Sequence, residues 1–367
     1  CFAFEEKLQI MKIYIKFIVL GFTKIILIVS VIFFLFSLLL NLFEEINFFK
    51  DKNENLYYPL LLNFLNAPTI LNKIFPFIFL ISTQFLIIKM IDRNELIILK
   101  NFGIDNIKLI SIISLVSFFI SLLLIIFFYN FSAKLKHIYL DIKNDFASDN
   151  KYLAVITENG IWIKDGTDDH TNIINANIIE GKILKNVIIT QFDKNFIAKK
   201  YIYAKNINIE NKVWTIKKAI VLENNMRTVE ENFLFKSNFN SEKINTLFSN
   251  LNSLTIWELF ELRRDYESVG YSVNGINLHL QKIYSFPIYL TILTIFASVL
   301  MLNVPINKPK LFYLLLGIFV SVLIFYINHF SALLGENNKL PITLSVWLPH
   351  VIVSILTGIG MVRVNEK

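Results

Sequence analysis

The chain has 367 residues, of which 54% are hydrophobic and only 18% charged, and its mean hydropathy is +0.54. Soluble domains carry roughly 25% charged residues, so this composition excludes an ordinary soluble enzyme and indicates an integral membrane protein. A single cysteine excludes a disulfide scaffold, a cysteine-based zinc site and an iron–sulfur cluster, and the net charge of +7 is interpreted as a topology signal rather than as nucleic-acid binding.

The first ten residues differ in pattern from the rest of the chain. Residues 1–10 contain no methionine, whereas Met11 precedes basic residues and then an apolar run. We interpret residues 1–10 as a non-native upstream extension and Met11 as the natural start. The alternative, a lipidated Cys1, lacks a signal-peptide pattern before it.

Six apolar runs are candidates for membrane spans, because a bilayer core about 30 Å thick needs about 20 apolar residues in a helix. A weaker second run is flanked by Lys73 and Lys89, whose long stems allow the ammonium groups to reach the interfaces. The six group as three within 11–131 and three within 277–367. They are Ile25–Phe43, Ile74–Ile88, Leu109–Phe131, Ile283–Asn307, Leu311–Gly335 and Leu340–Val362.

Residues 89–108, between the second and third runs, form a short amphipathic segment. Apolar residues recur at i, i+3 and i+6, Gly103 is expected to end a helical turn, and Asp105 is expected to cap the next span. The segment is either a solvated loop that reverses the chain or a helix that docks into a partner's groove. In the second interpretation the contact residues are Arg93, Glu95, Leu96, Leu99, Phe102 and Gly103.

Residues 132–252 have a different pattern, with short stretches that alternate between apolar and polar. Period-2 alternation between turn signals such as Asn211-Lys212 predicts an antiparallel sandwich or jelly roll. The expected strands are Tyr152–Thr157, Ile161–Lys164, Ile173–Ile179, Ile183–Phe192, Asn195–Ala204 and Val213–Leu222.

A connector helix is predicted over 253–276, between the β domain and the fourth span. Thr255 and Glu258 have capping-box spacing, and Gly270 is a suitable helix stop. The predicted fold is therefore a membrane α-helical protein with six spans, three plus three, around an inserted extracytoplasmic all-β jelly-roll-like domain.

Topology is predicted from the basic residues beside the spans. Lysines and arginines concentrate before the first span, between the second and third, between the fourth and fifth, and at the chain's end. The positive-inside rule then places both termini in the cytoplasm and the β domain on the extracytoplasmic side.

A family resemblance rests on these residues. The pattern R-x-E-L followed by glycine, here Arg93, Glu95, Leu96 and Gly103, resembles the coupling segment of the LptF/LptG permeases of the lipopolysaccharide-export ABC transporter. The connector LTIWELFELRRDYESVGYS, the terminus LPITLSVWLPH and the three-plus-three architecture are similar too, over 11–367. The connector and the terminus are more similar to the LptG subunit than to LptF.

The resemblance implies a function and a set of partners. It implies a permease subunit that extracts lipopolysaccharide from the inner membrane, a second homologous permease, a cytoplasmic ATPase dimer and a periplasmic β-jelly-roll protein that receives the lipid. No G-x-x-x-x-G-K-[ST] occurs in the chain, so ATP hydrolysis is expected on a partner and the chain itself is not expected to be an enzyme. No cofactor, metal or nucleic acid is expected.

One departure concerns the end of the first span. Members of the family usually carry basic residues there to meet lipid phosphates, whereas this chain has Glu44 and Glu45. Lys73, Lys134 and Lys136 are substitute lipid contacts, or lysines that only reach toward the interface. The alternative to transport is a membrane-anchored periplasmic interaction or scaffold protein. A secondary transporter is disfavoured because the apolar runs contain no acidic residue.

Overall fold

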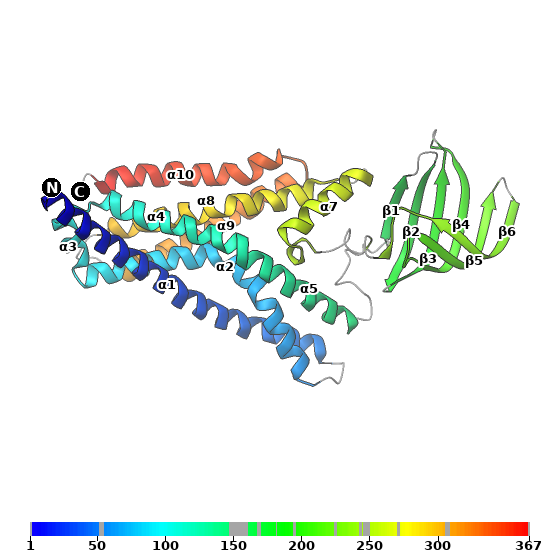
Figure 1. Ribbon diagram of the computed structural model, residues 1–367, viewed down its shortest axis with the longest axis horizontal. Helices are drawn as coiled ribbons and strands as arrows, with labels where there is room; N and C mark the ends of the chain where they lie inside the picture. The colour runs from blue at the N-terminus through cyan, green and yellow to red at the C-terminus, as the bar shows by residue number, and fades with distance from the viewer. Residues whose placement is uncertain are drawn as a thin grey trace. The chain divides into compact units, whose positions relative to one another are not determined.

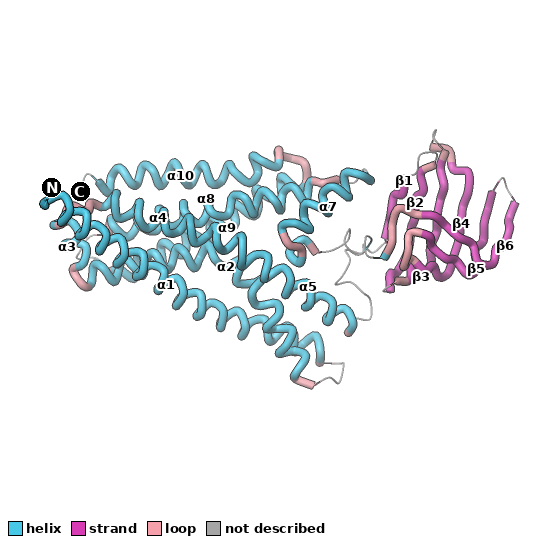
Figure 2. Tube along the Cα trace, viewed as in Figure 1, coloured by secondary structure: helices cyan, strands magenta, loops and turns pink. Residues whose placement is uncertain are grey.

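The computed structural model describes residues 2–50, 55–146, 161–166, 170–180, 182–193, 196–223, 226–241, 244, 250–269, 272–304 and 309–365. The chain forms two compact units, one of Cys1–Ala133 with Asn274–Lys367 and the other of Lys134–Val273. Long helices make up the first unit and the sheet belongs to the second (Figures 1 and 2). The expected strand at Tyr152–Thr157 and the expected helix stop at Gly270 lie outside the described residues.

Six helices in the described residues are long and apolar enough to cross a membrane, which confirms the six predicted spans. These helices are longer than the apolar runs predicted from the sequence. The span that includes α1, for example, covers 37 residues, a length of roughly 55 Å compared with a hydrocarbon core of about 30 Å. Both termini and the short helix α3 lie at the same end of the helical unit (Figure 1). The helices are α1 (Phe2–Phe49), α2 (Tyr57–Asp92), α3 (Glu95–Asn101), α4 (Asn106–Leu123) continued by a π-helix (Leu124–Tyr129) and α5 (Asn130–Asp145), α8 (Asn274–Leu302), α9 (Lys310–Glu336) and α10 (Ile342–Asn365).

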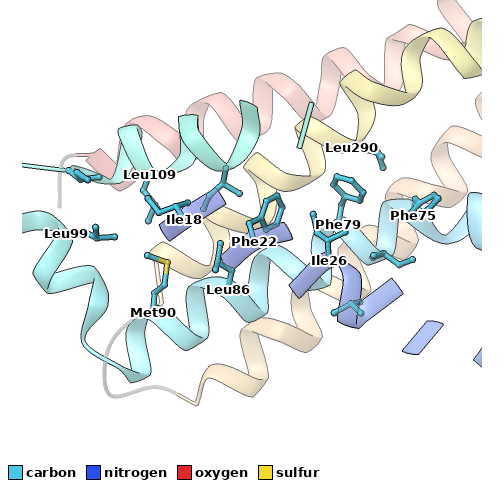
Figure 3. Close-up of a cluster of buried hydrophobic side chains, with 14 of the residues drawn as sticks. Ile18, Phe22, Ile26, Phe75, Phe79, Leu86, Met90, Leu99, Leu109 and Leu290 are labelled. Atoms are coloured by element: carbon cyan, nitrogen blue, oxygen red, sulfur yellow. The ribbon is translucent and has the colours of Figure 1, made fainter. Parts of the chain in front are cut away.

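The core of the helical unit forms around α2 and α8. In the most apolar 18 residues of each helix, 67% are buried in α2 and 61% in α8, but only 22% in α1 and 17% in α9. Phe22 of α1, Phe79 of α2 and Leu290 of α8 are fully buried and belong to one apolar cluster (Figure 3). The outer helices therefore expose apolar faces, as expected where lipid replaces water as the solvent.

The second unit contains an antiparallel sheet, which confirms the inserted all-β domain. Its described strands pair in sequence order, β1 to β6, as one meander. Each neighbouring pair is antiparallel. The strands are β1 (Ile161–Gly166), β2 (Thr171–Glu180), β3 (Ile183–Phe192), β4 (Ala198–Asn208), β5 (Val213–Glu223) and β6 (Met226–Lys236).

Strand β6 was not predicted, because its sequence lacks a clean alternation. It is an edge strand and nearly all of its side chains are exposed, so charged residues such as Arg227 and Glu230 are tolerated on it.

A line of interrupted pairing crosses the sheet from β2 to β6. Asn186 in β3 and Asn232 in β6 have φ values of 50° and 61°, in the left-handed region that asparagine tolerates. Along this line the alternation of buried and exposed side chains shifts by one residue. In β5, for example, the neighbours Lys217 and Lys218 are both exposed. The pairing register is the same on both sides of this line, because Ile216 pairs with Phe233 and Lys218 pairs with Glu231.

The segment after β6 and the connector helix complete the second unit. The carboxylate of Asp165, fully buried in β1, accepts hydrogen bonds from the Ser237 hydroxyl at 2.7 Å and the Asn238 side-chain amide at 2.9 Å. Helix α7 spans Ile256–Val269. The capping box that begins it is confirmed, because the Thr255 N–H donates to Glu258 Oε2 at 2.7 Å and the Glu258 N–H donates to Thr255 Oγ1 at 3.4 Å.

Candidate functional site

The segment between α2 and α4 forms a fixed, two-turn helix. Helix α2 ends at Asp92, and Asn94 adopts φ 58° and ψ 13°, a left-handed conformation that redirects the chain into α3. At the far end of α3 the Gly103 N–H donates to the Lys100 carbonyl at 2.9 Å, and the Ile104 N–H donates to the Leu99 carbonyl at 3.0 Å.

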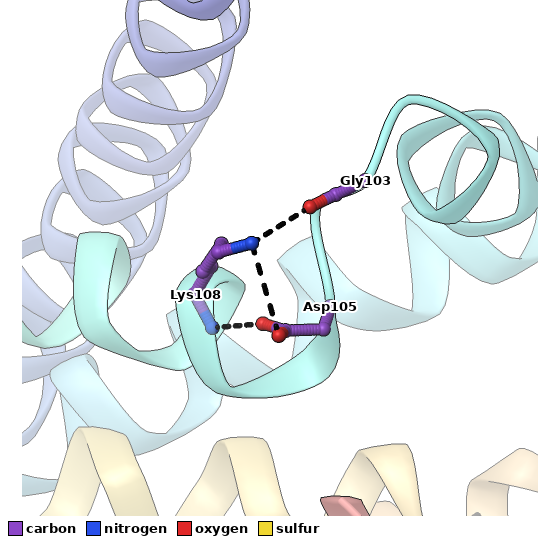
Figure 4. A network of polar contacts seen from close by, with 3 residues as sticks. All are labelled: Gly103, Asp105 and Lys108. Atoms are coloured by element: carbon purple, nitrogen blue, oxygen red, sulfur yellow. Dashed lines mark hydrogen bonds and ion pairs between the residues drawn. The ribbon is translucent and has the colours of Figure 1, made fainter.

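These two bonds make a Schellman ending, for which the left-handed φ of +81° at Gly103 is suited. The Lys108 N–H donates to Asp105 Oδ1 at 2.8 Å, so Asp105 caps α4. The Lys108 ammonium also donates to the Gly103 carbonyl at 2.9 Å (Figure 4). The predicted turn at Gly103 and the predicted cap at Asp105 are confirmed.

The two faces of α3 differ from the expected arrangement. Leu99 is only 4% exposed and lies in the apolar cluster with Ile18 and Met90, and Leu96 packs against the same cluster (Figure 3). Leu99 is buried because the cluster surrounds its side chain with apolar neighbours. Leu96 and Leu99 therefore anchor α3 to the chain's own core rather than facing outward.

The outward face of α3 is apolar as well. Ile97 and Ile98 are 59% and 49% exposed. Phe102 is also exposed, with its ring centroid 5.3 Å from that of Tyr14 in α1. Arg93 and Glu95, the two charged residues of the pattern, approach to 4.0 Å. Sequence reasoning missed Ile97 and Ile98, because two turns of helix do not define which apolar residues face inward.

A groove of about 430 Å³ lies between α1 and α2, with Ile318 of α9 also lining it. Most of its lining is apolar, and Phe36 and Leu40 of α1 are more than half exposed. The polar lining residues Ser37, Asn41 and Glu44 lie along one face of α1, at spacings of four and three residues. The apolar lining residues include Phe33, Phe36 and Leu40 of α1 and Ile74, Phe77 and Ile81 of α2.

A ladder of asparagine side chains joins α1 to α2 beside the groove. The Asn41 amide donates to Asn63 Oδ1, and the Asn66 amide donates to Asn41 Oδ1, both at 2.9 Å. The Asn63 amide in turn donates to the Leu38 carbonyl at 3.0 Å. These buried bonds fix the position of the Asn41 side chain, and with it the polar end of the groove.

The three candidate lipid-contact lysines are not among the groove's lining residues. Lys73 of α2 is exposed and close enough to His279 of α8 for an electrostatic interaction. Lys134 and Lys136 belong to the second compact unit, where the Lys136 ammonium lies 3.9 Å from the centre of the Tyr139 ring. Lys73 therefore belongs to the first compact unit, and Lys134 and Lys136 belong to the second.

In the described part of the chain, no group of three His, Cys, Asp or Glu side chains is arranged so that it could bind a metal ion. His350 of α10 is buried and stacks on Tyr289, with ring centroids 4.8 Å apart. That histidine packs as part of the helical core.

The family comparison covers most of the chain. The model of the family "Lipopolysaccharide export system permease LptF/LptG" matches residues 16–363, which overlap all six spans and include the inserted sheet. No curated protein matches the chain. Because the family match spans far more than half of the sequence, the chain belongs to the LptF/LptG family of lipopolysaccharide export permeases and is a multi-pass inner-membrane protein.

Proposed function

We propose that the chain is the LptG-like permease subunit of an ATP-driven exporter that lifts lipopolysaccharide out of the inner membrane. The groove between α1 and α2 would take acyl chains, since its lining is apolar over most of its length. A second homologous permease would face it, a cytoplasmic ATPase dimer would supply the energy, and a periplasmic β-jelly-roll protein would receive the lipid.

The observation that carries the ATP-driven part of this proposal is the outward face of α3. Ile97 and Ile98 stay exposed at the same end of the helical unit as both termini, on a helix held by Leu99 and Gly103. Exposed apolar side chains on a fixed amphipathic helix suit insertion into a partner's groove. Glu95 lies beside them and would meet a basic or hydrogen-bonding group of the ATPase.

The test replaces Glu95 by alanine in the full chain. Removing one partner of a desolvated charge pair costs about 2–5 kcal/mol, so Glu95→Ala should lose the ATPase during purification and stop lipid export while abundance in the membrane stays unchanged. Glu261→Ala, an exposed carboxylate of α7, is the control and should be neutral. Full ATPase association and full export in Glu95→Ala would reduce residues 89–108 to a connecting loop.

Orientation is a second part of the proposal, supported by the positive-inside rule. We place both termini and α3 in the cytoplasm and the β unit in the periplasm. Single cysteines at exposed Asn211 and Lys100, in a chain whose Cys1 is replaced by serine, should label differently with a membrane-impermeant thiol reagent in intact cells. Labelling at position 211 alone supports this orientation, and labelling at position 100 alone inverts it.

Transfer to a periplasmic partner would use a sheet edge. Among the described strands, β1 and β6 are the two edges, and an edge offers unpaired backbone groups to an added strand. Photo-crosslinkers placed along β6 and β1 should capture a periplasmic β protein. Crosslinkers in β4, which pairs on both sides, serve as the control.

A further inference from the structure

We propose that the polar end of the α1–α2 groove binds a head group that donates hydrogen bonds, an amine or a sugar hydroxyl, and that it rejects a phosphate. The inference rests on the proposed function in one respect, that the ligand is a lipid whose chain occupies the groove. It adds the chemistry of the part of the lipid that lies at Glu44.

The charge of the lining favours a head group that donates hydrogen bonds. Glu44 carries the charge among the described residues that line the groove, and its side chain is exposed. Within the described residues, no lysine, arginine or histidine lines the groove and no ion pair forms with Glu44. An ionised carboxylate only accepts hydrogen bonds, so it attracts an ammonium or a hydroxyl and repels a phosphate oxygen.

Along α1 the lining of the groove changes from apolar to polar. Phe33 and Phe36 come first, then Ser37 and Asn41, and then Glu44. From Phe33 to Glu44 the helix rises roughly 16 Å, at 1.5 Å per residue. An amphiphile lying along this face would bury its chain beside the phenylalanines and bring its head to Asn41 and Glu44.

The neutral polar groups at this end of the groove are held in place by hydrogen bonds. Asn41 is only 4% exposed and uses its side chain to bond both Asn63 and Asn66. Its carbonyl oxygen has a second lone pair and its amide a second hydrogen, enough to order a sugar or amine head but without positive charge. Lys73, which could otherwise bind a phosphate, is not among the residues that line the groove.

The experiment compares three photoactivatable lipids on the full chain in nanodiscs. Each probe has the same dodecyl chain with a mid-chain diazirine, and the heads are an ammonium, a glucoside and a phosphate. Peptide mapping by mass spectrometry locates and counts adducts on residues 33–44 and 70–81. Variants are Glu44→Gln and, as the matched control at the end of α9, Glu336→Gln, and each sample is repeated with Mg²⁺ and with EDTA.

We expect the ammonium and glucoside probes to label the groove about tenfold more than the phosphate probe. Glu44→Gln should remove most of the ammonium probe's advantage and Glu336→Gln should leave it intact. Equal labelling by all three probes, insensitivity to Glu44→Gln, or phosphate labelling that needs Mg²⁺ would each overturn the head-group inference while leaving the lipid function standing. Absence of groove labelling by every probe would instead contradict the proposed lipid function.

Discussion

Leu99 is the residue that holds α3 against the helical unit, and its truncation should loosen the segment measurably. Leu99→Ala removes three carbon atoms from a side chain that is 4% exposed. At about 0.8 kcal/mol per buried carbon group, the transfer cost is about 2.4 kcal/mol, within the range of about 2–5 kcal/mol found for such truncations. The free energy of opening α3 should fall by this amount.

Hydrogen exchange of the amides that close the α3 ending reports this opening directly. The Gly103 and Ile104 N–H groups bond to carbonyls of α3, so they exchange only when the turn opens. A loss of about 2.4 kcal/mol should speed their exchange about 50-fold in Leu99→Ala.

Ile97→Ala is the matched control for Leu99→Ala. It also removes three carbons, but from a side chain that is 59% exposed. The free energy of opening α3 should fall by about 1 kcal/mol or less, which speeds amide exchange at most about fivefold. The higher helix propensity of alanine offsets part of this loss. Equal acceleration in both variants, or none in Leu99→Ala, would refute the inward assignment of Leu99.

Three further predictions concern other parts of the chain. Asn41→Leu should lower the free energy of unfolding of the purified chain, measured by thermal melting, by about 1–3 kcal/mol, because Asn63 Oδ1 loses the Asn41 donor and the Asn66 amide loses the Asn41 acceptor; unchanged stability would contradict the ladder. Gly335→Ala should destabilise the packing of α9 on α10, since its Cβ would lie 2.7 Å from Ser345 Cβ, whereas Gly358→Ala meets nothing within 4 Å and should be neutral in the same melting assay. Asp165→Ala should make the second unit about 1–3 kcal/mol less stable, because donors that now bond its carboxylate lose their acceptor; protease resistance of the sheet should fall, and retained resistance would contradict this role.

The membrane spans could be predicted because the physical requirement is local. Each span needs about 20 apolar residues, and the chain shows that pattern in sequence. The turn at Gly103 and the caps at Asp105 and Thr255 were predictable for the same reason, since each depends on residues within a few positions.

The groove and the faces of α3 depend on residues that are distant in sequence. Ile318 of α9 completes a surface made by α1 and α2, and no local pattern indicates that contact. Asn41, Asn63 and Asn66 stand out as amides within apolar surroundings, but their spacing of 22 and 25 residues does not indicate that they bond each other. Glu44 stood out in the sequence because basic residues were expected at this end of the first span. The structure shows that Glu44 lines the groove, which the sequence could not indicate.

The central claim, that a lipid travels along the α1–α2 groove, is tested most directly by a photo-crosslinking amino acid at position 36 in living cells. Phe36 lines the groove and is 53% exposed, whereas Ile352 of α10 is 49% exposed and does not line it. The account predicts lipopolysaccharide adducts at position 36 that change in amount when cellular ATP is depleted, and few adducts at position 352. Equal adducts at both positions, or none at position 36, would contradict it.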